Sequence, residues 1–281
     1  MELRKQFMFR GNASALSGLF YRPKTVIVDM PGASSLGVSG GRSQAQIAGR
    51  SFGDVIRFGS AVTFAEGLYD DEKLARAVSD HKGEPETLNA TTNVMAEIRE
   101  LAVGEKPLFT ARRIRGALVS SSPRGSGEPS IAAGKSSAIQ GVEIGGFGLD
   151  VALNTSLFQK YDTRSKVAAA ADDPKVVAKF RQHFVLDATI KGQSRRGGLV
   201  VRNGLIYTTI VERISWIGKP FPGSKIDGHT VTIPDFGKIF FGELLVGGSE
   251  RRLTMVRFDL GSPYGGWADG GGVDTNGSFY P

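Results

Sequence analysis

The sequence predicts a mainly β protein, a sandwich or barrel of antiparallel strands with a few short helices packed on it or inserted into it. Short runs of β-branched and aromatic residues recur along the chain, and most of its 38 glycines lie between them. That is roughly twice the usual glycine share of about 7%. An α/β sheet would need strands that alternate regularly with helices, and this pattern is missing. The 281 residues suffice for one large β domain or two smaller ones.

Residues 1–160 are predicted to form a β-rich region with a helical insertion near 70–104. Short apolar runs at 6–9, 16–21 and 25–28 indicate strands. The Gly/Ser-rich stretch 32–53 indicates a loop or a set of tight turns. A half-buried strand follows, in which alternation places Ile56, Phe58, Val62 and Phe64 on one face.

Two helices are predicted inside the insertion. Acidic residues at 70–72 suit the first turn of one helix. A second helix is expected to begin after Thr91 or Thr92, because Val94, Ile98 and Leu101 have i, i+4, i+7 spacing. Gly104 is placed to end that helix.

Strands are expected to resume at residues 108–120, 142–144 and 149–153, with a long Ser/Gly/Pro loop over 121–137. Residues 161–184 are predicted to be a helical connector. In that connector Asp173 is a suitable N-cap, followed by proline at the first helical position.

Residues 185–281 are predicted to form an antiparallel β region with a glycine-rich tail, which could join the first region in one continuous domain. Asn203–Gly204 signals a two-residue hairpin, and residues 247–250 suit a four-residue hairpin loop. This second loop would place Glu243 opposite Thr254 and predicts an ion pair between Glu243 and Arg252. Residues 265–281 show no periodicity and indicate a loop.

The formal charge of +7 favours anionic partners, namely nucleic acid, anionic lipid or an acidic polysaccharide. The absence of cysteine excludes disulfides and thiolate chemistry. The first residues lack the apolar core of a secretory signal peptide, and no apolar run is long enough for a membrane-spanning helix. A cytoplasmic location is the default expectation, with export by a non-classical route as the alternative.

Catalytic motifs are scarce. Residues 127–136 end in Gly134–Lys135–Ser136, but six residues separate Gly127 from that triplet where a P-loop has four. Residues 247–250 lack the second glycine of the G-x-S-x-G elbow of serine hydrolases, and they suit a hairpin where that elbow needs a strand–turn–helix. Its three histidines lack metal-ligand spacing: they are His81, His183 and His229. We therefore expect no cofactor and no metal site, and a non-enzyme is favoured over an enzyme.

Paired carboxylates for glycoside hydrolysis can come from distant strands, so spacing leaves this alternative open. The candidates in predicted strands are Glu143, Asp150, Asp187, Glu212 and Glu243. The competing interpretation is that these side chains face solvent or pair with strand arginines such as Arg213 and Arg257.

Two arginine clusters are candidates for binding an anionic polymer. They consist of Arg112, Arg113 and Arg115 in a predicted strand and of Arg195 and Arg196 in a predicted hairpin turn. The competing interpretation is that these are ordinary solvated arginines that guard strand edges.

Three hypotheses follow. The favoured one is a structural or self-assembling β-rich protein without catalytic activity, whose partners are copies of itself. The second is a binder of an anionic polymer through the arginine clusters. The third is a glycoside hydrolase that uses two carboxylates.

Overall fold

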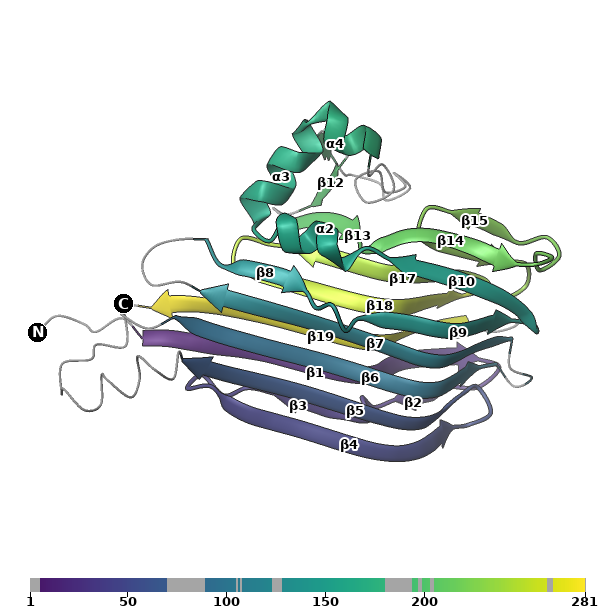
Figure 1. The fold of residues 1–281 in the computed structure, drawn as a ribbon. Coiled ribbons are helices and arrows are strands. Elements are labelled where there is room, and N and C mark those ends of the chain that lie inside the picture. The colour runs from purple at the N-terminus through teal and green to yellow at the C-terminus, as the bar shows by residue number, and fades with distance from the viewer. Residues whose placement is uncertain are drawn as a thin grey trace, which may run out of the picture.

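The computed structural model describes residues 6–69, 89–104, 106, 108–122, 128–179, 194–196, 199–202, 205–261 and 265–280. For residues 6, 194–196, 199–202, 205 and 276–280 it describes the backbone alone. The described chain forms two antiparallel sheets that pack face to face, with short helices at one side (Figure 1). The prediction of a mainly β fold with a few short helices is confirmed.

The first sheet, which we call sheet I, has 11 strands and the order β11-β12-β13-β17-β18-β19-β1-β2 along its main path. In addition, β16 pairs with β17 and β15, and β3 pairs with β1. Its strands are β1 (Gln6–Arg22), β2 (Val26–Val28), β3 (Ala33–Ser35), β11 (Ser194–Arg196), β12 (Leu199–Arg202), β13 (Leu205–Thr209), β15 (Lys225–Asp227), β16 (Thr230–Ile233), β17 (Gly237–Val246), β18 (Glu250–Leu260) and β19 (Gly265–Tyr280). Because β19 pairs with β1, the first and last parts of the chain share this sheet.

The second sheet, sheet II, has 8 strands in the order β14-β10-β9-β7-β6-β5-β4, and β8 pairs with β7. Its strands are β4 (Gly41–Phe52), β5 (Ile56–Tyr69), β6 (Ala90–Val103), β7 (Phe109–Ser122), β8 (Ser130–Ala133), β9 (Ala138–Ile144), β10 (Phe147–Leu153) and β14 (Val211–Ile217). Most of its long strands follow one another in the chain and pair as a meander.

The core lies between the two sheets. The ring of Phe109 on β7 meets Phe258 on β18 edge to face at 4.9 Å, and Phe241 on β17 at 6.4 Å. All three rings are fully buried. Aromatic pairs of this kind stabilise a core beyond the effect of their buried area, so these rings hold sheet II against sheet I.

Along each long strand of sheet I, alternate residues face the core, and at one level of the sheet every long strand switches to the other set of alternate residues. Along β18 the buried side chains are Leu253 and Met255 and then Val256 and Phe258, so two neighbours in sequence both face inward. The register places corresponding positions of the adjacent strands at the same level. These positions form a row across the sheet, with one residue from each of β1, β19, β18 and β17. The residues are Ala15, Gly271, Met255 and Gly242, and all four are buried.

A matching row crosses sheet II. Along β6 the inward side chains are Val94, Ala96 and Ile98 and then Leu101 and Val103, with two exposed neighbours between the two sets. The register places this row at Gly49, Gly59, Glu100, Arg112 and Gly141 on β4, β5, β6, β7 and β9. An additional residue in a strand bends it and shifts its alternation. Because each strand in a row contributes one additional residue at the same level, the strands stay paired in register.

Three helices are described between β10 and β11: α2 (Thr155–Lys160), α3 (Arg164–Asp172) and α4 (Pro174–Lys179). Asn154 and Thr163 cap α2 and α3 through their side chains. The Asp173 carboxylate accepts a hydrogen bond from the Lys175 amide at 2.9 Å, as predicted for an N-cap. The helical connector is therefore present over 164–179, and its residues 180–184 lie outside the described chain.

Several predicted elements are wrong. The predicted helix of residues 92–104 is strand β6, so the described part of the insertion near 70–104 is not helical. The predicted loop of residues 32–53 contains β3 and β4, and the predicted loop of residues 121–137 contains the end of β7 and all of β8. The glycine-rich tail is strand β19. The helix expected from residue 70 falls outside the described residues.

The row in sheet II also explains an error within a strand that was predicted correctly. Ile56 and Phe58 of β5 face the core, but Val62 and Phe64 face outward, because the facing changes at Gly59. Strict alternation cannot anticipate that change.

Both hairpin predictions agree with the strand pairing. Arg202 pairs with Leu205, as the predicted two-residue hairpin requires, and residues 203–204 lie outside the described residues. Val246 pairs with Arg251, the Gly247 amide donates to the Glu250 carbonyl at 2.8 Å, and Glu243 lies opposite Thr254 as predicted.

We predict that Gly271→Ala destabilises the fold by about 1–3 kcal/mol. Gly271 has φ +66°, and an added Cβ would lie 3.0 Å from the Met255 Cβ. The matched control is Gly272→Ala, where the nearest atom would be the Ser14 carbonyl oxygen at 3.7 Å. Urea denaturation of both variants measures the difference, and an equal loss in the two would contradict a special role for the row.

Candidate functional site

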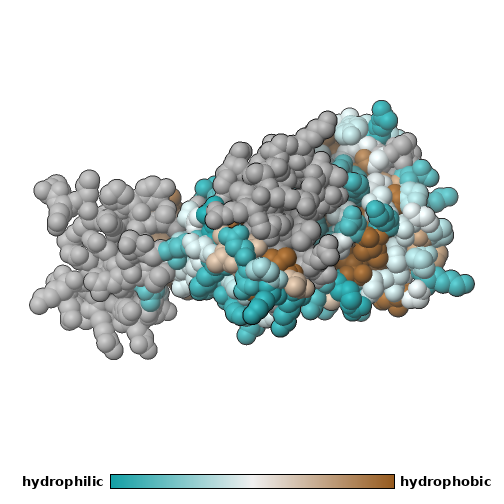
Figure 2. Space-filling view, turned by 90° about the horizontal axis from the view of Figure 1, so that it is seen from above, coloured by the Kyte–Doolittle hydropathy of each residue, from teal (hydrophilic) through white to brown (hydrophobic). Residues whose placement is uncertain are grey.

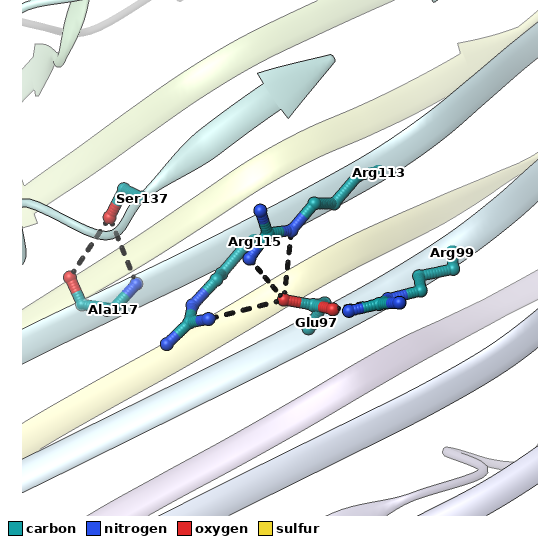
Figure 3. Close-up of polar contacts among 6 residues, drawn as sticks. All are labelled: Glu97, Arg99, Arg113, Arg115, Ala117 and Ser137. Atoms are coloured by element: carbon teal, nitrogen blue, oxygen red, sulfur yellow. Dashed lines mark hydrogen bonds and ion pairs between the residues drawn. The ribbon is translucent and has the colours of Figure 1, made fainter. Parts of the chain in front are cut away.

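Three arginines surround one glutamate on the outer face of sheet II (Figure 3). Arg99 donates to one carboxylate oxygen of Glu97 at 2.6 Å. Arg113 donates to the other oxygen through Nε and Nη2, at 3.0 and 2.8 Å, and Arg115 reaches the same oxygen at 3.4 Å. We call these four residues the Glu97 cluster.

Strand pairing positions the Glu97 cluster. Glu97 of β6 lies directly opposite Arg115 of β7, and Arg99 lies directly opposite Arg113. Two like charges opposite one another are destabilising, and here the carboxylate between them offsets the repulsion. The sheet thereby holds the three guanidinium groups close together.

Within the Glu97 cluster the negative charge is covered and the positive charges are exposed. The Glu97 side chain is 7% exposed, whereas that of Arg99 is 60% exposed. Burial alone would raise the pKa of Glu97, but the hydrogen bonds and charges of Arg99 and Arg113 outweigh it and hold that pKa below its ordinary value. The cluster therefore presents an excess of positive charge to solvent.

The predicted arginine sites are only partly brought together. Arg113 and Arg115 belong to the Glu97 cluster, whereas Arg112 lies in the row of additional residues and is exposed. Arg195 and Arg196 lie on β11, at the far end of sheet I, so the two predicted clusters belong to different sheets. The side chains of Arg195 and Arg196 are outside the described part of the structure.

Glu97 and Arg99 were not predicted as site residues, because they fell inside the predicted helix 92–104. Reading residues 91–99 as a strand would have placed both on one face. The hairpin to β7 would then have brought them to Arg113 and Arg115.

A second polar cluster lies on the outer face of sheet I. Arg257 donates to both oxygens of Glu243 at 2.7 Å, and its guanidinium lies 3.8 Å from the centre of the Phe240 ring. His229 Nε2 is 3.7 Å from Glu243. Burial would raise the pKa of Glu243, but hydrogen bonds and charge from Arg257 and His229 lower it to about 2. This cluster links β17, β18 and His229, the residue before β16.

The predicted ion pair between Glu243 and Arg252 is wrong. Arg252 instead lies 3.9 Å from Asp269 of β19. Because β18 changes its facing at Met255 and Val256, Arg257 faces outward and reaches Glu243 across the row. Under strict alternation from Thr254, Arg257 would point into the core.

The candidate carboxylates for glycoside hydrolysis behave as the competing interpretation predicts. Asp150 pairs with Arg213 at 2.9 Å, and Glu243 pairs with Arg257. Glu143 and Glu212 are exposed, and Asp187 lies outside the described residues. No group of three His, Asp or Glu side chains suited to a metal ion occurs within the described ranges. His81 and His183 are outside those ranges.

The segment that resembles a P-loop is a turn fixed to its neighbour. The Gly134 amide donates to the Ala117 carbonyl at 2.8 Å. Ser137 Oγ accepts from the Ala117 amide at 3.1 Å and contacts its carbonyl at 3.4 Å (Figure 3). Residues 134–137 thus connect β8 to β9, and the chain continues as a strand where a P-loop would begin a helix.

Arg251 is a buried charge near the start of β18. Its Nη2 donates to the Tyr161 carbonyl at 3.2 Å, while its Nη1 has no hydrogen-bond partner in the described structure. Burial lowers its pKa to about 10, although Asp162 and Glu128 act in the opposite direction. The bond to Tyr161 fixes the loop between α2 and α3 to β18.

The surface seen from above in Figure 2 has hydrophobic residues in small separate groups among hydrophilic ones, as far as its coloured part shows. A recess of about 230 Å³ near the hairpin 247–250 is lined by charges of both signs, including Arg10, Arg252 and Asp274. None of the described helices is long and apolar enough to cross a membrane.

These features define an antiparallel β-sandwich protein with charged clusters on the outer faces of its sheets. The chain belongs to the family described as "Domain of unknown function (DUF8256)", whose model matches residues 7–247. No curated protein and no solved structure matches the chain. Strands β18 and β19 lie beyond the matched range, yet they stand between β17 and β1 in sheet I.

We predict that acid weakens the fold partly through Glu243. Its folded pKa of about 2 lies below the ordinary value of 4.5, so its ion pair stabilises the fold above pH 4.5, and that stability is lost as the pH falls toward 2. The stabilisation is about 3 kcal/mol. Urea denaturation across this pH range should therefore show a smaller loss of stability for Glu243→Gln than for the natural protein.

The matched control for this experiment is Glu212→Gln, because the Glu212 side chain is exposed. This variant should follow the pH profile of the natural protein. Identical pH profiles for the natural protein and Glu243→Gln would overturn the assignment.

Proposed function

We propose that this protein is a non-catalytic β subunit that assembles with copies of itself. The observation that carries the proposal is strand β4, Gly41–Phe52, which has 12 residues and lies at the edge of sheet II. Among the described residues β4 pairs with β5 alone. Half of its backbone donors and acceptors therefore face away from the sheet, where a further strand could pair with them.

The composition of β4 supports pairing with another strand. Edge strands of monomeric proteins are commonly short, or protected by lysine, proline or an inward-pointing charge. Strand β4 has neither proline nor lysine, and its charged residues, Arg42 and Arg50, lie toward its ends. The middle of the strand, residues 43–49, is uncharged.

A second copy is the simplest occupant for this edge. In a symmetric dimer one patch meets the same patch of the partner. Two β4 strands would pair antiparallel about their middle, near Gln46 and Ile47, and join two copies of sheet II into one continuous sheet. Neighbouring β2 and β3 are committed to β1 of sheet I, so they do not compete for this edge.

Two of the described strand carboxylates favour a structural role over a hydrolytic one. Asp150 and Glu243 are each held by a partner arginine. A carboxylate in such a pair is not available as an acid or nucleophile without first breaking the pair.

Sedimentation velocity at micromolar concentration tests the proposal directly. We expect the natural protein to sediment as a dimer or a larger assembly. A strictly monomeric protein over that concentration range would refute it.

We predict that Gln46→Lys shifts the assembly toward the monomer and raises its dissociation constant several-fold. Gln46 is exposed at the middle of β4, so the substitution would bring two like charges together in the dimer. The control is Gln140→Lys on β9, an exposed glutamine on a strand that is paired on both sides. If both variants sediment like the natural protein, β4 is not the assembly edge.

A further inference from the structure

The Glu97 cluster carries more positive charge than is needed to pair with Glu97. Three arginines and one glutamate give the cluster a formal excess of two positive charges. One guanidinium would suffice to pair with one carboxylate. The additional arginines repel one another, and an anion bound from outside would relieve this repulsion.

The exposed side of the Glu97 cluster is the positive side. Arg113 and Arg115 have side chains that are 30% and 28% exposed, well above the 7% of Glu97. Arg115 Nε is buried and has no hydrogen-bond partner in the described structure, so the outward donors of this cluster are those of the other guanidinium nitrogens. Arg99 uses one described N–H group on Glu97, and its other donors are open to a ligand.

The positions that pair with the cluster on the adjacent strands are uncharged, although the exposed Glu100 follows Arg99 on β6. On β5, Val62 lies opposite Glu97 and Ser60 opposite Arg99. On β9, Ala138 lies opposite Arg115 and Gln140 opposite Arg113. These adjacent outward positions hold no acidic side chain that could neutralise the arginines, and none is bulky enough to hinder a long ligand.

An aromatic platform lies on the same face. Phe64 of β5 is two residues from Val62, and the Arg42 guanidinium lies 5.0 Å from the centre of its ring. Nucleobases stack on phenylalanine rings and on guanidinium planes, whereas sulfated sugars have no flat π face for such stacking. The face therefore combines donors for phosphate with a surface for bases.

We propose that the outer face of sheet II binds single-stranded nucleic acid, with the arginines of the Glu97 cluster on its phosphates and the Arg42–Phe64 pair beside its bases. Glu97 acts as a positioning residue that orients the guanidinium groups. Guanidinium groups fit phosphate oxygens in a two-pronged geometry. This inference is independent of self-assembly through β4.

The test is fluorescence anisotropy of a labelled oligothymidylate with the full chain at a series of KCl concentrations. Affinity should fall steeply with salt. Arg99→Gln combined with Arg113→Gln should weaken binding about tenfold and make the slope of log K against log salt shallower by about 0.7 for each phosphate that an arginine no longer neutralises.

The matched control is Arg213→Gln, which removes one arginine from the same sheet. Arg213 is 61% exposed, much like Arg99, but it is balanced by Asp150 at 2.9 Å. This variant should bind like the natural protein. Arg99→Gln alone should also weaken binding, and because this side chain is so exposed the single variant provides the test if the double variant does not fold.

Three results would overturn the proposal. The first is absence of binding, or binding that does not respond to salt. The second is an equal loss in Arg213→Gln and Arg99→Gln, which would indicate diffuse charge and no built site. The third is binding of heparin without binding of the oligonucleotide, which would assign the face to a sulfated polysaccharide.

Discussion

The long strands of the sandwich must change their inward face at the same level, and much of the structure depends on this constraint. A single strand with an additional residue would lose its register with both neighbours. Here the additional residues align across β1, β19, β18 and β17 in sheet I and across β4, β5, β6, β7 and β9 in sheet II. They face inward in sheet I and outward in sheet II, so the two bent sheets can stay in contact over Phe109 and Phe258.

The same constraint decides which residue types each row accepts. The inward row is small or apolar, as Gly271 and Met255 illustrate. The outward row contains glycine or a charge, as at Gly141 and Glu100. The row of sheet II therefore places additional charged side chains on the outer face of that sheet, beside the Glu97 cluster. On sheet I the change of facing turns Arg257 outward to Glu243.

Local signals predicted the fold class and the hairpins, because turn residues and alternation act over a few positions. These local signals gave wrong predictions where the rows of additional residues change the facing of the strands. Val94, Ile98 and Leu101 have helical spacing only because β6 changes its facing between Ile98 and Leu101. Strand β19 was missed because its glycines pack against neighbouring strands, an arrangement that only pairing with β1 and β18 reveals. The Glu97 cluster needed the β6–β7 register, which the predicted helix concealed.

Thiol labelling tests the change of facing most directly, because the chain has no cysteine of its own. In four separate variants a single cysteine would replace Thr254, Met255, Val256 or Arg257, and each folded variant would then be treated with a maleimide. The structure predicts rapid labelling at Thr254 and Arg257 and protection at Met255 and Val256, both of which are fully buried. Labelling that alternates strictly, at Thr254 and Val256 or at Met255 and Arg257, would contradict it.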